Sequence, residues 1–163
     1  MRKIYLLSFL TLLLSTAIMA QNVEFEEYDL SNGLHVILHQ DNSAPVVTTS
    51  VMYHVGAKDE AAGRTGFAHF FEHLLFEGTE NIPKGEFFKI VSANGGSNNA
   101  NTTQDRTYYY ETFPSNNLEL GLWLESERML HPVINQDGVD TQNEVEYYKN
   151  GGILQYVLRN MLN

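Results

Sequence analysis

The chain has 163 residues, no cysteine, and 20 acidic against 10 basic residues, which gives a formal net charge of −10 at neutral pH. This acidic balance disfavours nucleic acid and anionic membrane surfaces as partners. The lack of cysteine excludes a disulfide framework and a lipidated cysteine, so stability must come from an apolar core and any bound metal.

Residues 1–20 have the pattern of a secretory signal peptide. Arg2 and Lys3 precede an apolar stretch over residues 4–14, and small residues then lead to Ala20, after which we expect cleavage. A membrane anchor is the alternative, but the stretch falls short of the roughly 20 apolar residues that span a bilayer. We therefore expect an exported protein, periplasmic or secreted, with no stable membrane insertion after cleavage.

Strands are predicted first along the mature chain. Residues 24–28, 34–39 and 46–53 are rich in alternating, β-branched or aromatic residues. Asn, Gly, Asp and Ser separate them, which is typical of turns. The spacing predicts an antiparallel meander.

Helices then alternate with one further strand. Apolar residues at helical spacing, with glycine or proline at the ends, predict the helices, and a run of aromatic residues before Pro114 predicts the strand. The predicted fold class is α+β, with an antiparallel or mixed sheet and helices packed on one side. The predicted helices cover residues 67–76, 83–94, about 115–131 and about 139–148, and the strand covers residues 107–113.

Three polar side chains on the first predicted helix point to metal chemistry. His69, Glu72 and His73 have the spacing i, i+3 and i+4, which places them on one helical face. Two imidazoles one turn apart can share a tetrahedral zinc ion, and the glutamate can act as general base toward a water molecule. The alternative is that these are ordinary surface residues. The apolar residues of the opposite face, which we expect to be buried, argue against it.

The order His-x-x-Glu-His is a metallopeptidase signature, and the segment from Gly66 to Thr79 resembles the active-site helix of the pitrilysin/insulinase family. The resemblance also includes Asn32–Val36, Tyr53–Glu60 and the polar segment 95–108, and it covers about residues 23–145. It implies the amino-terminal half-domain of a zinc metalloendopeptidase.

The resemblance also implies the roles of individual residues. His69 and His73 would ligate Zn2+, and Glu72 would be the catalytic base. Asn99 and Ala100 would lie on an edge strand that pairs with an extended peptide or unfolded polypeptide substrate. On the residues alone, a polar loop is the alternative for the segment around Asn99.

A third zinc ligand is expected on a later helix, near residues 148–150, which read Tyr-Lys-Asn. Glu144 and Glu146 are the candidates to replace it, and Glu146 lies about one helical turn from the expected place. The resemblance ends after Val145, so we divide the chain into a signal peptide (1–20), an incomplete metallopeptidase domain (21–146) and a divergent tail (147–163). A frameshift or truncation would explain the change.

Three hypotheses follow for the function. The first is an exported zinc endopeptidase domain, inactive as this chain alone if it needs a second metallopeptidase-like domain or chain. The second is a non-catalytic subunit that keeps the fold and partners another chain. The third is a structural secreted domain in which the histidine and glutamate face is accidental.

Overall fold

The structure, a computed structural model, describes residues 23–62 and 65–149, with side chains described as far as residue 142. The expected signal peptide and most of the divergent tail lie outside these residues. The chain divides into a unit that ends at Ala44 and a second unit that begins at Pro45.

The described part of the first unit, residues 23–44, contains a β-hairpin. Strands β1 (Glu26–Asp29) and β2 (His35–Leu38) pair antiparallel. The turn is formed by Asn32, whose side-chain oxygen accepts from the Leu34 N–H at 3.1 Å, and by Gly33, which has a φ of +87°. Glycine adopts that conformation without steric cost.

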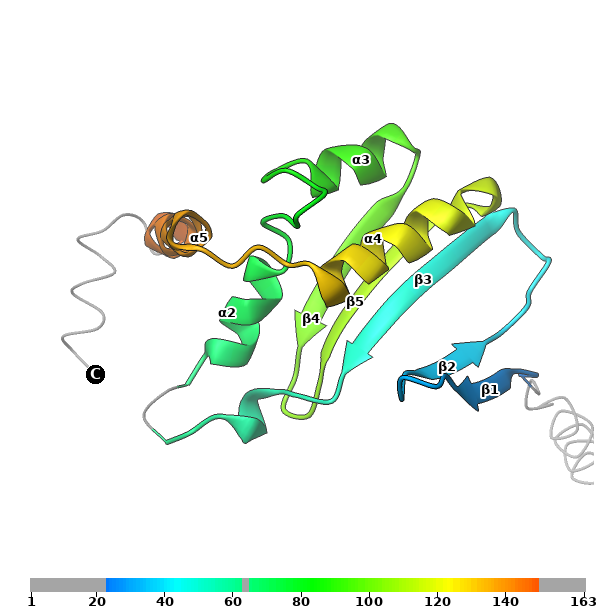
Figure 1. Ribbon diagram of the computed structural model, residues 1–163, viewed down its shortest axis with the longest axis horizontal. Coiled ribbons are helices and arrows are strands. Elements are labelled where there is room, and N and C mark those ends of the chain that lie inside the picture. The colour runs from blue at the N-terminus through cyan, green and yellow to red at the C-terminus, as the bar shows by residue number, and fades with distance from the viewer. Residues whose placement is uncertain (1–22, 63–64, 150–163) are drawn as a thin grey trace, which may run out of the picture. The chain divides into compact units, whose positions relative to one another are not determined.

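The second unit contains an antiparallel three-stranded sheet in the order β3-β5-β4 (Figure 1). The expected meander is wrong beyond the hairpin, because β3 pairs with β5. That partner lies some sixty residues later, beyond the reach of a local turn pattern. The strands are β3 (Val46–Tyr53), β4 (Ser97–Thr102) and β5 (Thr107–Pro114).

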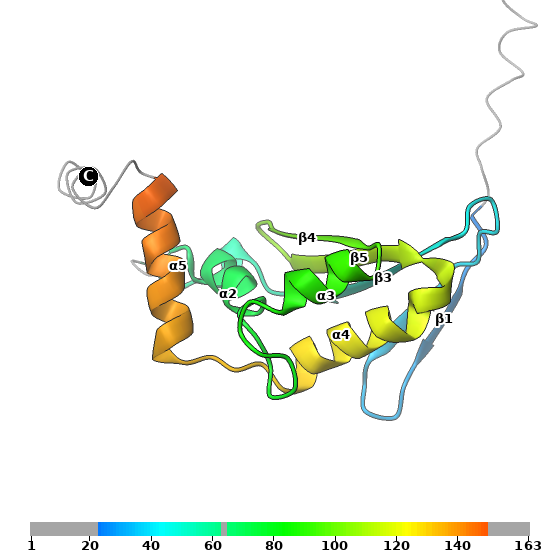
Figure 2. The same ribbon diagram turned by 90° about the horizontal axis from the view of Figure 1, so that it is seen from above.

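The helices that pack against this sheet lie on one side of it (Figure 2), and the fold is α+β as predicted. Residues 107, 109, 111 and 113 of β5 are buried on that face, as the two-residue period of a strand requires. The helical elements are η2 (Ala57–Asp59), α2 (Phe67–Leu74), α3 (Phe87–Ala93), η3 (Ser115–Asn117), α4 (Leu118–Leu130) and α5 (Gln136–Lys149).

The apolar core lies between α3, α4 and β5. Its fully buried members are Ile82, Phe87, Val91, Phe113 and Leu124. Helix α3 begins at Phe87 and not at Pro83 as expected, because Gly85 has a φ of +77° and ends a turn there. Among the described residues, no helix has both the length and the apolar character needed to cross a membrane.

Candidate metal centre

Helix α2 carries the candidate metal ligands, and its first turn is held by a side chain from the preceding loop. Gly66 precedes the helix with a φ of +94° and has no capping side chain of its own. The Glu60 carboxylate instead accepts from the N–H groups of Gly66 and Ala68, each at 2.8 Å. A carboxylate at this end also complements the helix dipole.

His69 and His73 bring their rings together one turn apart on α2. Their Nε2 atoms lie 3.0 Å apart, and the ring centroids are separated by 4.6 Å. Two nitrogens that ligate one tetrahedral zinc ion at about 2.0–2.1 Å would be about 3.3 Å apart. The pair therefore fits two positions of a zinc site after a shift of a few tenths of an ångström.

Glu72 lies between the histidines in sequence and is nearly buried, with 8% of its surface exposed. The hydroxyl of Thr102, at the end of β4, donates to its Oε2. The Tyr109 hydroxyl donates to its backbone carbonyl at 3.2 Å. Burial raises the pKa of Tyr109 above its usual range, so this hydroxyl remains a donor.

The apolar face of α2 is less buried than expected. Phe67 is 52% exposed and Phe71 is 44% exposed. Both line an open pocket of about 470 Å³, together with Tyr53, Tyr109 and one side of Glu72. Neither histidine lines this pocket. Successive residues of a helix are about 100° apart, so residues 67 and 71 lie on a different side of α2 from residues 69 and 73.

Within the part of the chain whose side chains are described, no group of three or more histidine, cysteine or acidic residues could hold a metal ion. Glu144 and Glu146 lie on α5, but their side chains lie outside that part. The structure thus assembles two of the expected zinc ligands.

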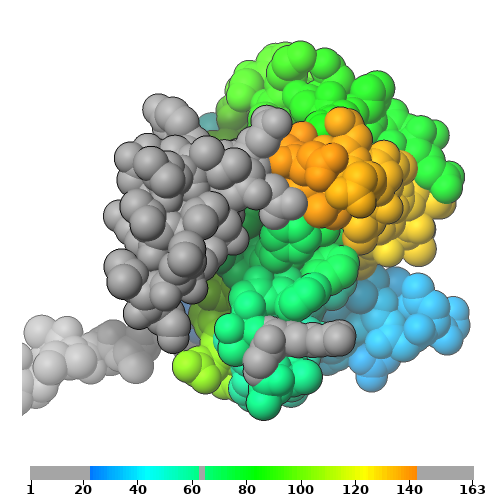
Figure 3. Space-filling model, turned by 90° about the vertical axis from the view of Figure 1, so that its left-hand side faces the viewer, coloured from blue at the N-terminus to red at the C-terminus, as the bar shows by residue number. Residues whose placement is uncertain are grey.

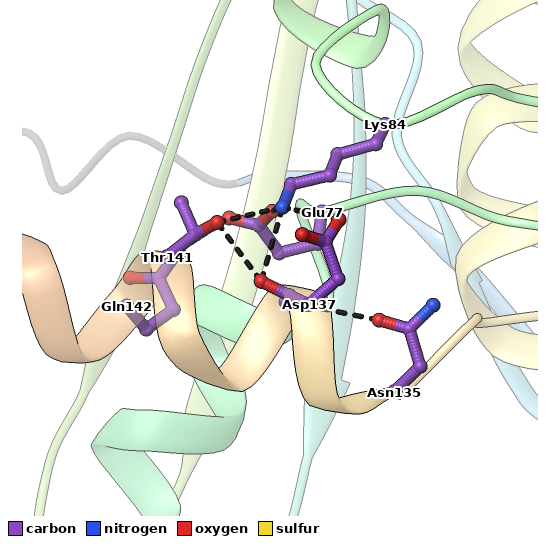
Figure 4. A network of polar contacts seen from close by, with 7 residues as sticks. Glu77, Lys84, Asn135, Asp137, Thr141 and Gln142 are labelled. Carbon is purple, nitrogen blue, oxygen red and sulfur yellow. Dashed lines mark hydrogen bonds and ion pairs between the residues drawn. The ribbon is translucent and has the colours of Figure 1, made fainter.

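Helix α5 is attached beside the end of α2 by a polar network (Figure 4). Lys84 Nζ donates to Asp137 Oδ2 at 2.7 Å and to Thr141 Oγ1 at 2.6 Å, and it lies 3.6 Å from Glu77 Oε2. Gln142 donates to the other oxygen of Glu77. Figure 3 shows the first turns of α5, in orange, against the green segments to which α2 and α3 belong. A zinc ligand carried by α5 would therefore approach α2 from the side on which this polar network lies.

Asn99 and Ala100 lie on β4, the edge strand beside β5, so the segment is not a polar loop. The Asn99 side chain accepts from the Ala100 N–H at 2.9 Å. Thr102, which bonds Glu72, is three residues from Asn99 on the same strand. Sequence reasoning missed the side chains that hold α2, which are Glu60, Thr102, Tyr109 and Arg128.

Comparison with known proteins places this geometry in a family. Residues 35–162 match the family model of the insulinases, peptidase family M16. The chain belongs to this family. The match runs past Val145, where the motif resemblance ends.

The relatives are named as proteases or as an insulin-degrading enzyme. The chain is 38% identical over 131 residues to zinc protease PqqE of Helicobacter pylori, covering 78% of this chain and 30% of that one. It is 30% identical over 120 residues to human insulin-degrading enzyme, covering 73% and 12%. A solved protease from Helicobacter pylori aligns with a TM-score of 0.74 at 34% identity, over 79% and 31% of the two chains.

A solved pitrilysin aligns with a TM-score of 0.71 at 22% identity, over 79% of this chain and 14% of that one, which shows the shared fold. The chain therefore spans less than a third of the length of these relatives.

Proposed function

We propose that this chain carries the zinc-binding helix and substrate strand of an exported metalloendopeptidase that acts on peptides or unfolded polypeptides. The observation that carries the proposal is the 3.0 Å approach of His69 Nε2 and His73 Nε2, beside a nearly buried Glu72. The names of the protease relatives support the same reaction class. Export rests on the signal-like sequence of residues 1–20.

His69 and His73 would hold the metal, and Glu146 or Glu144 on α5 is the proposed third ligand. When bound, zinc supplies Lewis acidity that activates water and polarises a peptide carbonyl. Glu72 would take the proton of the attacking water. Within the described part of the chain, the hydrogen bond from Thr102 uses Oε2, so Oε1 is the oxygen that would receive it.

Strand β4 would bind the substrate backbone. Among the described strands β4 pairs with β5 alone, so its other edge could take up an extended peptide, which would add a strand beside Asn99 and Ala100. Thr102 connects that edge to Glu72, so a peptide bound along β4 would run toward the proposed base. Main-chain hydrogen bonds of this kind form with many substrate sequences, which suits unfolded polypeptides as substrates.

Zinc binding by the untagged, full chain tests the proposal, with affinity measured by competition against a chromophoric chelator. His69→Ala and His73→Ala should each weaken binding by more than about tenfold, because each removes a ligand. Glu72→Gln should bind zinc as the unchanged chain does, because it keeps the shape of the side chain and removes the base.

His54→Ala is the matched control, since it removes an exposed histidine from a loop outside the pair. Equal zinc affinity in the unchanged chain and in His69→Ala would overturn the metal site. Loss of zinc in Glu72→Gln would make Glu72 a structural residue. A chain that binds zinc but never cleaves an unstructured peptide, even with a partner domain, would be the non-catalytic subunit.

A further inference from the structure

The last turn of α2 obtains two of its hydrogen bonds from outside the helix. The final carbonyls of a helix have no partner within it. Three of those in α2 accept from the backbone N–H groups of residues 75–77. The carbonyl of Glu72 accepts from the Tyr109 hydroxyl at 3.2 Å, and that of Leu75, the residue that caps the end of α2, accepts from Arg128 Nη1 at 3.2 Å.

Arg128, on α4, cannot move without losing many contacts. Its side chain is fully buried, and its guanidinium donates hydrogen bonds to the Glu111 carboxyl group at 2.9 Å and to the Glu125 carboxyl group at 3.2 Å. A buried cation is tolerated only when it is paired and hydrogen-bonded, and the planar guanidinium fixes the direction of each bond. Aromatic rings surround it at 4.3–4.5 Å from their centroids, and these belong to Tyr109, Phe76 and Phe87.

Helix α2 depends on such outside contacts because it is short. It has eight residues, and isolated helices below about 12–15 residues are marginal in water. Arg128 places a positive charge beside the negative end of its dipole. The two carbonyls that it and Tyr109 hold belong to the turn that contains Glu72 and His73.

We infer that Arg128 and Tyr109 are positioning residues for the metal centre, which hold the last turn of α2 so that the two imidazoles and the Glu72 carboxylate keep their relative places. The inference rests on the proposed zinc site. Neither residue touches the metal position, so both act through the backbone of α2. Residues that orient metal ligands typically contribute 10–100-fold to metal affinity.

Tyr109→Phe and Arg128→Lys in the full chain test the inference. Tyr109→Phe removes only the hydroxyl, and Arg128→Lys keeps the charge but loses the planar set of donors. Amide hydrogen exchange of residues 72–77 should become faster than in the unchanged chain. Zinc affinity, measured where every variant is folded by circular dichroism, should fall by about tenfold or more.

Gly121→Ala is the control for general destabilisation. Its new methyl group would meet Thr49 on β3, whose described side-chain hydrogen bond is to Glu111 and not to α2, so it should lower stability without changing zinc affinity or exchange in residues 72–77 beyond its global effect. If Arg128→Lys does not fold, the zinc affinity and amide exchange of Tyr109→Phe alone test the inference.

Unchanged exchange at the end of α2 in Tyr109→Phe would overturn the inference, even if the chain binds zinc. If no form of the chain binds zinc, the proposed function fails, and the exchange rates still decide whether these residues hold α2. Equal losses of zinc affinity in Tyr109→Phe and Gly121→Ala would mean that the loss reflects lower stability alone. That result would also overturn the inference.

Discussion

Arg128 lies between two buried carboxylates, and the charges of this cluster do not balance. Burial, the hydrogen bond with Glu125 and the charge of Glu125 raise the pKa of Glu111 from 4.5 to about 9, while Arg128 opposes the rise. Glu111 therefore keeps a proton at neutral pH in the folded chain. The cluster then holds one cation against one carboxylate, which is the cheaper arrangement in a dry interior.

This proton predicts a pH dependence of stability. Between about pH 4.5 and 9 the folded chain holds a proton on Glu111 that the unfolded chain has lost, so the free energy of unfolding falls as pH rises. Glu111→Gln should remove that contribution and make the decline shallower, by up to about 1.4 kcal/mol per pH unit. Urea unfolding of both proteins at pH 5, 7 and 9 measures how steeply the free energy of unfolding falls.

Glu119→Gln, an exposed glutamate on α4, is the matched control and should follow the unchanged chain. An identical slope for Glu111→Gln and the unchanged chain would mean that Glu111 is ionised at neutral pH.

At the scale of elements, α4 packs unusually close to β3 at Gly121. A methyl group there would lie 2.7 Å from Thr49 Oγ1 and 3.0 Å from its Cγ2. Thr49 is buried and β-branched, so it cannot swing aside. Gly121→Ala should therefore lower the free energy of unfolding by about 1–3 kcal/mol.

Urea unfolding of the single and double variants checks this steric account. Adding Thr49→Ala should recover part of the loss, so the two changes should be non-additive. Gly138→Ala, where the nearest atom would be 3.5 Å away, should be neutral or slightly stabilising. Equal losses in Gly121→Ala and Gly138→Ala would show that close packing is not the cause.

Local patterns in the sequence predicted the elements that bear the candidate site. The i, i+3 and i+4 spacing placed His69, Glu72 and His73 on one helix, and β3 has the predicted bounds of residues 46–53. The supports of α2 were not predictable in this way. Tyr109 lies 37 residues along the chain from Glu72, and Arg128 lies 53 residues from Leu75. A pattern of neighbouring residues carries no information about such distant contacts.

The exposure of Phe67 and Phe71 belongs to the same class of long-range effects. Their helical spacing predicted burial, but burial also needs an element to cover that face. Within the described residues, α4 covers the part of the sheet near Thr49 and Phe113, and the pocket beside Tyr53 and Tyr109 stays open. Periodicity predicts which residues share a helix face, but only the tertiary structure shows whether another element covers that face.

At the scale of the whole molecule, the placement of α5 decides whether the metal site can be completed. Lys84 and Gln142 attach α5 beside the end of α2, and the helix runs to Lys149. A catalytic zinc site uses three protein ligands and one open position. The described side chains include two of the proposed ligands, His69 and His73, and the family resemblance expects the third near residue 149.

A carboxylate at that place should therefore tighten zinc binding. We predict that Lys149→Glu raises the zinc affinity of the full chain by more than about tenfold, because it completes a set of two histidines and one glutamate. Lys149→Gln, which removes the same positive charge without adding a carboxylate, should bind zinc much as the unchanged chain does. Chelator competition on the three proteins separates a new ligand from a change of charge.

Hydrolysis should remain slow even in Lys149→Glu, because His69 is exposed and the described residues do not enclose a substrate away from water. An unstructured peptide should be cleaved well below about 1 per second, a low rate for an enzyme. If the unchanged chain reaches that rate and a chelator stops it, the site is already complete. Glu144 or Glu146 would then be the third ligand, and Glu146→Gln and Glu144→Gln would identify which one by the loss of zinc.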